Sequence, residues 1–261
     1  MKAMSNYSRF HGKTVLITGS TGGIGQALVE RFVGEGAKLV LIDSDLPRLN
    51  AQARALGSRA SGFACDVTRE DQCEAAFVAA MSQHTRIDVA VLNAGIEGKI
   101  ADISELSVDD FDWVMAVNAR GVFIWLSKLM KLMKAQSSGV ITITSSTAGL
   151  VGSPGLGAYV SSKHAVVGLM KCAALEGAPY GIRVNAVSPG AIDTRMMRSI
   201  EESMGLPDAV REQFISSIPL KRYGSPTEIA FMVAFLSSDE AGFSTGATFL
   251  ADGGVLAGRS R

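Results

Sequence analysis

Short apolar segments alternate with helical stretches along this chain, and this alternation limits the possible folds more than any single residue does. Most of the segments are apolar throughout rather than at every second position, which is typical of parallel strands covered on both faces. The expected strands are Thr14–Thr18, Lys38–Asp43, Ser61–Ala64, Val89–Asn93, Val140–Ser145, Arg183–Ser188 and Ala247–Ala251. Repeated strand–helix units with right-handed crossovers predict an α/β fold, in which a single doubly wound parallel sheet carries helices on both faces.

Helical patterns fill the intervals between the expected strands. They cover Gly23–Gly34, Leu46–Leu56, Arg69–Gln83, Val108–Ala135, Ala158–Ala178, Ile200–Ile215 and Ser225–Ser237. The sequence contains no internal repeat, low-complexity tract or linker rich in proline and glycine. We therefore predict one domain over residues 1–261.

Composition argues against several kinds of partner. Lys and Arg together number 25, as do Asp and Glu, so no net charge attracts nucleic acid or an anionic membrane. No apolar run reaches the ~18 residues of a membrane span, and Met1–Gly12 lacks the apolar stretch of a signal peptide. Cys65, Cys73 and Cys172 lack metal-ligand spacing, and the histidines are scattered, so we expect no metal, buried reduced thiols and a cytoplasmic protein.

The first expected strand leads directly into a glycine-rich loop, and a helical pattern follows the loop. The loop reads Thr18-Gly19-Ser20-Thr21-Gly22-Gly23-Ile24-Gly25. Glycines let the backbone turn tightly and approach a pyrophosphate, and the free amides and dipole of a helix start favour an anion. A structural glycine turn is the alternative, but the strand before it and the helix after it favour a dinucleotide site.

Asp43 ends the second expected strand, eighteen residues after Gly25. A carboxylate at this point can accept hydrogen bonds from both adenosine ribose hydroxyls and repels a 2′-phosphate. Neither the loop nor Ser44 offers a base to hold that phosphate, which predicts NAD rather than NADP. Two alternatives stay open, because Asp43 can cap the following turn with Asp45, and Arg48 can reach a phosphate.

Tyr159 and Lys163 stand four residues apart, so a helix places both side chains on one face. A nearby cation favours the phenolate, and we expect Lys163 to lower the pKa of Tyr159 from about 10 toward neutrality. Such a phenol can pass protons to and from an alcohol or ketone oxygen. The spacing alone is a weak signal, and the glycine loop supplies its context.

Several motifs, taken in order, resemble the classical short-chain dehydrogenase/reductase family. They are Thr18-Gly19-x-x-x-Gly23-x-Gly25, Asp66-Val67, Asn93-Ala94-Gly95, Asn118, Ser146, Tyr159-x-x-x-Lys163, Pro189-Gly190 with Thr194, and Asp252-Gly253-Gly254. The resemblance covers the chain from about Gly12 to Gly254 and implies that the domain over residues 1–261 is a single Rossmann-like dinucleotide-binding catalytic domain. Eight motifs in register make coincidence negligible.

The resemblance implies a set of catalytic residues. Tyr159 would be the acid/base, and Lys163 would lower its pKa and bind the nicotinamide ribose. Ser146 would hold the substrate oxygen, and it is preferred to Ser145 because it lies thirteen residues before the tyrosine. Asn118 would anchor a water that links Lys163 to solvent. A phenolate beside a cation, with a hydroxyl fixing the reacting oxygen, suits the proton transfer that accompanies hydride departure.

The resemblance also implies the contacts of the cofactor, with Asp66 hydrogen-bonded to the adenine. The implied residues are Gly19, Thr21, Gly23, Ile24, Gly25, Asp43, Asp66, Val67, Asn93, Ala94, Gly95, Tyr159, Lys163, Pro189, Gly190, Ile192 and Thr194. For each of them the alternative is a turn or core position, and Asn93 in particular can hold a neighbouring loop.

The stretch from Arg195 to Ile218 has no strand signal and is rich in methionine and other large apolar residues. Resembling proteins use this stretch as a lid, which we place near residues 193–218; a helix packed on the core is a compatible alternative. The residues expected to face the substrate are Ile96, Val151, Ser153, Leu156 and Met196. The run Asn93–Lys99 resembles NAD-dependent reductases of cyclic ketones, such as levodione reductases.

These inferences predict an NAD-dependent oxidoreductase that transfers a hydride between the cofactor and a secondary alcohol or ketone, with a cyclic or aromatic substrate favoured. A 3-oxoacyl thioester reductase is the alternative enzyme, and Asp43 argues against it. A non-catalytic dinucleotide-binding scaffold is the alternative of another class, and the complete catalytic set argues against it. The spacing of Tyr159 and Lys163 disfavours reduction of a C=C bond.

The resemblance further implies a homotetramer. Two long helical stretches carry apolar or small residues that we expect on exposed faces, and the C-terminal stretch is apolar almost to its end. The residues expected on these exposed helix faces are Val114, Val117, Phe123, Trp125, Leu126, Val166, Val167 and Ala174.

Overall fold

The structure is a computed structural model that describes residues 8–258, and those residues form one seven-stranded parallel sheet in the order β3-β2-β1-β4-β5-β6-β7. The strands are β1 (Thr14–Thr18), β2 (Lys38–Asp43), β3 (Ala60–Ala64), β4 (Val89–Leu92), β5 (Gly139–Thr144), β6 (Ile182–Pro189) and β7 (Thr248–Ala251). The predicted fold is confirmed, and every expected strand ends within one residue of the observed one. The ends of the predicted domain, residues 1–7 and 259–261, lie outside the described residues.

The helices follow the expected order, with two differences. They are α1 (Gly23–Gly34), α2 (Leu46–Leu56), α3 (Glu70–Gln83), α4 (Val108–Met115), α5 (Gly121–Gln136), α6 (Gly157–Gly177), α7 (Arg195–Met204), α8 (Pro207–Ser217) and α9 (Pro226–Ser237). A π-helical turn, Ala116–Arg120, interrupts the helix expected over Val108–Ala135. The helix expected over Ile200–Ile215 is two helices, because Gly205 has a φ of 137° and Pro207 starts a new helix.

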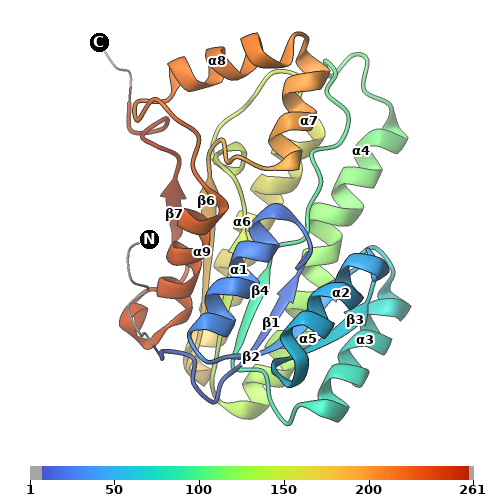
Figure 1. Ribbon diagram of the computed structural model, residues 1–261, viewed down its shortest axis with the longest axis vertical. Coiled ribbons are helices and arrows are strands. Elements are labelled where there is room, and N and C mark those ends of the chain that lie inside the picture. Colours follow the sequence, from blue (N-terminus) through green and yellow to red (C-terminus); the bar gives the residue numbers. More distant parts are fainter. Residues whose placement is uncertain (1–7, 259–261) are drawn as a thin grey trace.

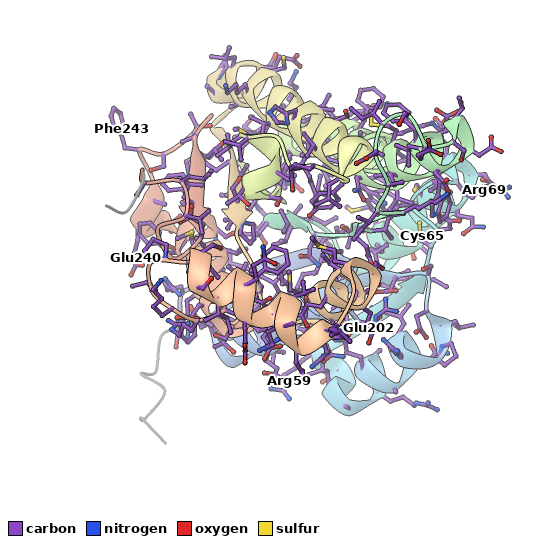
Figure 2. The ribbon with its side chains drawn as sticks, turned by 90° about the horizontal axis from the view of Figure 1, so that it is seen from above. Arg59, Cys65, Arg69, Glu202, Glu240 and Phe243 are labelled. Carbon is purple, nitrogen blue, oxygen red and sulfur yellow. The ribbon has the colours of Figure 1, made fainter. Side chains whose placement is uncertain are left out.

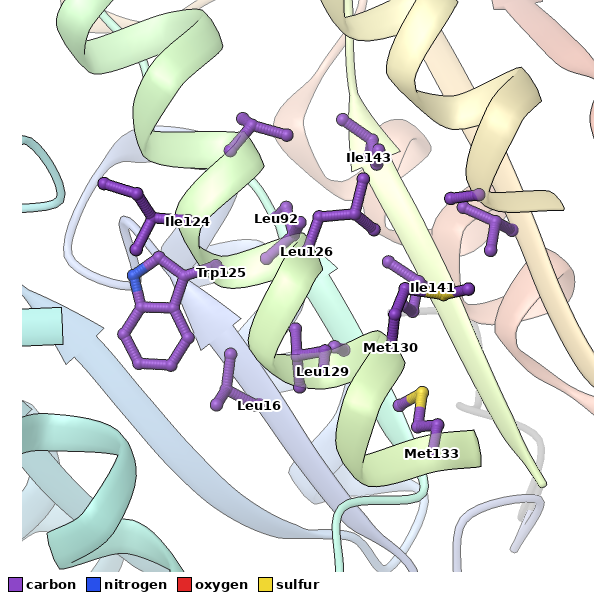
Figure 3. Close-up of a cluster of buried hydrophobic side chains, with 14 of the residues drawn as sticks. Leu16, Leu92, Ile124, Trp125, Leu126, Leu129, Met130, Met133, Ile141 and Ile143 are labelled. Atoms are coloured by element: carbon purple, nitrogen blue, oxygen red, sulfur yellow. The ribbon is translucent and has the colours of Figure 1, made fainter. Parts of the chain in front are cut away.

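Helices lie on both faces of the sheet (Figure 1), and an apolar layer fills the space between the sheet and the helices of each face. Helices α3, α5 and α6 cover one face, and α1, α2 and α9 cover the other. Successive residues of β1 divide between the layers, since Leu16 belongs to the first and Ile17 to the second. Figure 3 shows the first layer, where Trp125 and Leu129 of α5 are buried beside Leu16. Burial of each such side chain contributes roughly 1.5–3 kcal/mol.

The strand order reverses between β1 and β4, because the chain builds β2 and β3 on one side of β1 and the remaining strands on the other. Ligands of open α/β sheets bind at the carboxyl ends of the strands around such a reversal. Helices α7 and α8 lie beyond this carboxyl edge (Figure 1). Within residues 8–258, no helix combines the length and the apolar composition needed to cross a bilayer.

Two expectations about exposure are wrong. Of the eight residues expected on exposed helix faces only Phe123 is exposed, because α4, the π turn, α5 and α6 bury the other seven in the core. Exposed apolar residues do occur nearby at Val108, Phe111 and Trp113. Cys65 and Cys73 are buried as expected, whereas Cys172 is exposed.

Candidate active site

The π turn between α4 and α5 places Asn118 inside the protein, where its side chain is fully buried. Its Oδ1 accepts from the amide of Ile96 at 2.8 Å, and its Nδ2 donates to the Ile96 carbonyl at 2.8 Å. The same Nδ2 donates to Oγ of Ser162 at 3.1 Å. Asn118 therefore joins the loop after β4 to helix α6, and π turns of this kind are frequent at functional sites.

Helix α6 carries Tyr159 and Lys163 on one face, as the spacing predicts. Lys163 Nζ lies 5.5 Å from the centroid of the Tyr159 ring and donates to the carbonyl of Thr144, at the end of β5, at 3.0 Å. A Cβ placed on Gly95 would lie 3.3 Å from Oδ1 of Asn118 and 3.4 Å from Lys163 Nζ. Three of the four predicted catalytic residues, Asn118, Tyr159 and Lys163, thus gather at the carboxyl edge of the sheet.

Of the two adjacent serines, Ser146 contacts Tyr159 and Ser145 contacts the backbone of α6. Ser146 follows β5, accepts from the amide of Ala148 at 3.1 Å and hydrogen-bonds to Tyr159. Ser145 is buried, and its hydroxyl donates to the carbonyl of Lys163 at 3.3 Å. The serine thirteen residues before Tyr159 is therefore the one beside the phenol.

Burial changes the proton affinities of Tyr159 and Lys163 in opposite directions. The pKa of Tyr159 is raised, first by burial, while the hydrogen bond from Ser146 works against that rise. Burial lowers the pKa of Lys163 to about 8. The expected lowering of the Tyr159 pKa toward neutrality is wrong, because burial of the phenol outweighs the hydrogen bond from Ser146.

Glu97 acts on this site through its charge, and it was not among the predicted site residues. It lies in the loop after β4, and its negative charge also raises the pKa of Tyr159. The sequence signal was present, because Glu97 stands four residues after Asn93 in the run compared with cyclic-ketone reductases. Its approach to Tyr159, however, depends on how the loop packs against α6.

The glycine loop turns between β1 and α1 in a conformation that requires its glycines. Gly19 has a φ of +66°, and a Cβ on Gly25 would lie only 2.0 Å from the carbonyl oxygen of Gly19. Helix α1 begins after Gly22, and no side chain within residues 8–258 caps its first turn. The loop therefore presents backbone amides at a helix start, which is a common anion-binding arrangement.

Asp43 lies at the end of β2 and holds this loop. Its Oδ2 accepts from both the amide and the hydroxyl of Thr21, each at 2.9 Å. Its Oδ1 accepts from the amide of Asp45 at 3.0 Å, so the turn-capping contact considered from the sequence is present. Arg48 forms an ion pair with Asp45 at 3.2 Å.

Asn93 performs the scaffold role considered for it. Its Nδ2 donates to the carbonyl of Gly19 at 3.2 Å, and its Oδ1 accepts from the Thr144 hydroxyl at 3.1 Å. The amides of Asn93 and Ala94 both donate to Oγ1 of Thr18, at 3.0 and 3.2 Å. The loop after β4 is thereby tied to the ends of β1 and β5.

The remaining predicted cofactor residues lie at two parts of the same edge. Asp66 and Val67 form the turn after β3, where Oδ1 of Asp66 accepts from the amide of Thr68 at 2.9 Å. Pro189 ends β6, and the amide of Gly190 donates to the Ala251 carbonyl at 3.0 Å. The buried Ile192 and the half-buried Thr194, which caps α7, follow. A Cβ on Gly23 would meet Thr194 at 2.9 Å, so this segment reaches the glycine loop.

Of the residues expected to face the substrate, Val151, Ser153 and Leu156 lie just before Tyr159 in the sequence, whereas Ile96 follows β4 and Met196 lies in α7. Leu156 pairs with Ala101 in a short bridge, whereas Val151 and Ser153 are exposed. Met196 is half-buried in α7. Their grouping into one pocket stays a prediction. A cavity of about 520 Å³ lies elsewhere, between the segment after α8 and the end of β7, and of the predicted site residues only Ile192 lines it.

Comparison with known proteins identifies the family. A family model described as Enoyl-(Acyl carrier protein) reductase matches residues 19–256. Levodione reductase of Leifsonia aquatica is 40% identical over 257 residues, which are 96% of this chain and 96% of that protein. The chain belongs to the short-chain dehydrogenase/reductase family. It is therefore an enzyme and an oxidoreductase.

Other members of the short-chain dehydrogenase/reductase family match over almost their full length. The 3-oxoacyl-[acyl-carrier-protein] reductase FabG of Thermotoga maritima is 38% identical, covering 95% of this chain and 99% of that protein. A 2,5-dichloro-2,5-cyclohexadiene-1,4-diol dehydrogenase of Sphingobium indicum is 36% identical, covering 96% and 99%.

Solved structures of the short-chain dehydrogenase/reductase family agree with this fold. Levodione reductase superposes with a TM-score of 0.94 at 39% identity, covering 96% of this chain and 100% of that one. An NAD⁺-bound xylitol dehydrogenase gives 0.89 at 36% identity, covering 93% and 98%. A 3-ketoacyl-(acyl-carrier-protein) reductase of Brucella melitensis complexed with NADH gives 0.86 at 33% identity, covering 94% and 98%.

Members of the short-chain dehydrogenase/reductase family bind a nicotinamide dinucleotide, and the residues present here fit one. The uncapped start of α1 offers amides to a pyrophosphate. The hydroxyls of Ser20 and Ser188 are buried at the carboxyl ends of β1 and β6 and have no partner among residues 8–258. Buried polar groups normally have partners, so these hydroxyls suit a polar ligand at this edge.

Proposed function

We propose that this protein is an NAD-dependent dehydrogenase/reductase that interconverts a secondary alcohol and a ketone, with a cyclic or aromatic substrate preferred. The gathering of Asn118, Ser146, Tyr159 and Lys163 beside the glycine loop carries the proposal. A bound nicotinamide cofactor would supply or accept the hydride. The proton that must leave the alcohol, or join the ketone oxygen, is then the task of the protein.

Each residue of the group has a distinct part in that proton transfer. Tyr159 Oη gives its proton to the ketone oxygen or takes one from the alcohol. The Ser146 hydroxyl, hydrogen-bonded to Tyr159, holds the reacting oxygen in position. Lys163 binds the nicotinamide ribose and favours the phenolate when it is charged, and Asn118 fixes the loop after β4 against α6.

Asp43 supports the choice of NAD. Its carboxylate lies at the end of β2 beside the glycine loop, where it disfavours a 2′-phosphate. Arg48, the base considered for that phosphate, is paired with Asp45. The similarity to an NAD⁺-bound xylitol dehydrogenase points the same way. We expect kcat/KM for NAD to exceed that for NADP by at least about tenfold, which is ~1.4 kcal/mol.

A 3-oxoacyl thioester reductase is the second candidate. The similarity to FabG of Thermotoga maritima and to the Brucella melitensis enzyme complexed with NADH favours it. A cyclic substrate is supported by the similarity to levodione reductase and to a dehydrogenase named for a cyclohexadienediol. The four-residue spacing of Tyr159 and Lys163 favours carbonyl over C=C chemistry, although the matching family model bears an enoyl reductase description.

The wider setting of the enzyme is also a proposal. We place it in the cytoplasm as one catalytic domain with a small-molecule substrate. Its acidic and basic residues balance, which argues against nucleic-acid or membrane partners. Helices α7 and α8 form the substrate lid. Four copies assemble through exposed apolar residues of α4 and α5, including Trp113 and Phe123.

One assay tests the proposed function. NAD and NADP reduction is followed over a panel of cyclic, aryl and 3-hydroxyacyl substrates, with the wild type and Tyr159→Phe. We expect turnover of a secondary alcohol with NAD, and a loss of 10²–10⁴-fold in Tyr159→Phe with NAD binding retained. Binding of NAD without turnover of any substrate would favour a scaffold, and residual activity within about tenfold of the wild type would remove Tyr159 as the proton carrier.

A further inference from the structure

Two buried thiols lie in contact at the carboxyl end of β3. Cys65 directly follows the strand and Cys73 lies in the first turn of α3, and their Sγ atoms are 3.5 Å apart. Figure 2 shows Cys65 and Arg69 on the same side of the molecule. A disulfide has an S–S bond of ~2.05 Å, so bond formation would bring the two sulfurs about 1.5 Å closer.

The thiols lie directly behind the turn proposed to contact adenine. The Cys65 amide donates to the carbonyl of Asp43 at 2.9 Å. The thiol of Cys73 faces the carbonyl oxygens of Val67 at 3.6 Å and Asp66 at 3.9 Å. The pair therefore touches the backbone of both carboxylate residues proposed for the adenosine half of the cofactor.

The local environment favours a reactive Cys73. Its pKa is lowered, first because the Cys65 thiol donates a hydrogen bond to it, with the charge of Lys128 adding to the effect. Arg69 precedes α3 and provides no side-chain cap, and residues 69–72 are exposed. A helix start without a capping side chain opens easily, which gives a small reagent a route to the thiols.

We propose that Cys65 and Cys73 are a redox-sensitive pair, which a low-molecular-weight disulfide converts into an intramolecular disulfide that weakens dinucleotide binding. The effect on binding rests on the proposed function, whereas formation of the bond does not. It would be a reversible modification of a kind that cytosolic proteins use for redox sensing.

The chemistry balances with that one oxidant. The Cys73 thiolate attacks one sulfur of the reagent, whose S–S bond breaks and releases one thiolate. The Cys65 sulfur, after losing its proton, attacks Cys73 Sγ and expels the second thiolate. The protein loses two electrons and two protons, and the reagent is reduced to two thiols.

Weaker binding follows from what the bond does to the turn. Oxidation removes the S–H group that faces the Val67 carbonyl and draws the start of α3 toward the end of β3. Val67 cannot move freely to absorb this shift, because it packs against Gly121, where a Cβ would lie 2.9 Å from Val67 Cγ2. The shift therefore falls on Asp66, and its displacement disturbs the adenine site.

The test uses the full chain in a redox buffer of bis(2-hydroxyethyl) disulfide and 2-mercaptoethanol. Trypsin cleaves after Arg69, so a disulfide between Cys65 and Cys73 joins two different peptides that mass spectrometry identifies. Isothermal titration calorimetry measures the Kd for NAD in the reduced and oxidised protein. Cys65→Ala and Cys73→Ala each remove the bond, and Cys172→Ala is the control because it removes only the exposed thiol.

We expect the joined peptides in the wild type and Cys172→Ala, with a Kd for NAD that rises about tenfold and returns on reduction. Neither Cys65→Ala nor Cys73→Ala should show the change. Modification confined to Cys172, or a joined pair with an unchanged Kd, would overturn the proposal. A reduced protein that does not bind NAD would contradict the proposed function, while the peptide map would still report on the bond.

Discussion

At the scale of single residues, opposing influences set the pKa of Tyr159. Burial and the charge of Glu97 raise this pKa, and the hydrogen bond from Ser146 lowers it. Glu97→Gln removes the negative charge, so the pKa of Tyr159 should fall. Oxidation of an alcohol needs the phenolate of Tyr159. The pH–rate profile of alcohol oxidation by Glu97→Gln should therefore move to lower pH. Glu105→Gln, an exposed change farther along the same loop, should leave the profile in place. A Glu97→Gln profile at the wild-type position would show that this carboxylate does not act on Tyr159.

Lys163 links the site to the stability of the fold. Its pKa of about 8 lies below the ordinary 10.5, so between these values the unfolded chain binds more protons than the folded protein. The free energy of unfolding should therefore rise with pH in that range. Relative to Lys163→Met, the wild type should gain about 2–3 kcal/mol between pH 7 and pH 10, from ~1.36 kcal/mol per pKa unit. Denaturant unfolding at both pH values measures this, and Lys171→Met, an exposed change on α6, should show no such gain.

At the scale of elements, a polar cluster clamps α7, α8 and the segment after α8. The buried Glu201 of α7 accepts from the Tyr223 hydroxyl at 2.8 Å and lies 3.4 Å from Arg211 of α8. Tyr223→Phe leaves a buried carboxylate oxygen with one partner fewer, at a cost of roughly 1–3 kcal/mol. We expect a lower Tm and faster hydrogen exchange in α7, together with a raised KM for substrate.

The matched control for this clamp is Tyr180→Phe, which alters an exposed phenol distant from α7 in sequence. It should leave Tm, exchange and KM unchanged. Unaltered exchange in α7 of Tyr223→Phe would mean that the cluster does not hold the proposed lid.

The sequence predicted those elements whose conformation depends on local backbone geometry. The glycine loop is such a case, because the conformation of Gly19 and the close contact at Gly25 leave few residue choices. The π turn was missed, since nothing local marks it and the contacts of Asn118 with Ile96 and Ser162 accompany it. The split between α7 and α8 was missed for a different reason, because the apolar pattern continued across Gly205 and hid the break.

The sequence did not predict which helix faces become buried when the elements pack together. Val166 and Ala174 were expected on an exposed face of α6, yet both lie in the layer between α6 and the sheet. Their exposure depends on how many neighbours surround the helix, which its own periodicity does not report. Likewise, the net effect of burial on Tyr159 became visible only once the surroundings of the phenol were known.

At the scale of the whole molecule, exposed aromatic residues on α4 and α5 predict assembly. Trp113 is 53% exposed and Phe123 is 54% exposed, and such side chains favour burial against another subunit. Light scattering at micromolar concentration should give four times the 27.4 kDa mass of the chain. Trp113→Glu and Phe123→Glu should each lower that mass, whereas Val78→Glu on α3 should not. A native mass equal to one chain would refute the tetramer.

The π turn of Ala116–Arg120 also bears on the rotational phase of the helix that follows it. Each residue of an α-helix advances the side-chain direction by about 100°, so one residue more or less turns the whole next segment. A π turn instead takes up one extra residue within a single wider turn, so deleting one residue here would regularise the backbone and keep Trp125 and Leu129 facing the sheet. The deletion would remove the turn that carries Asn118, so at this point the site can be lost while the core is kept.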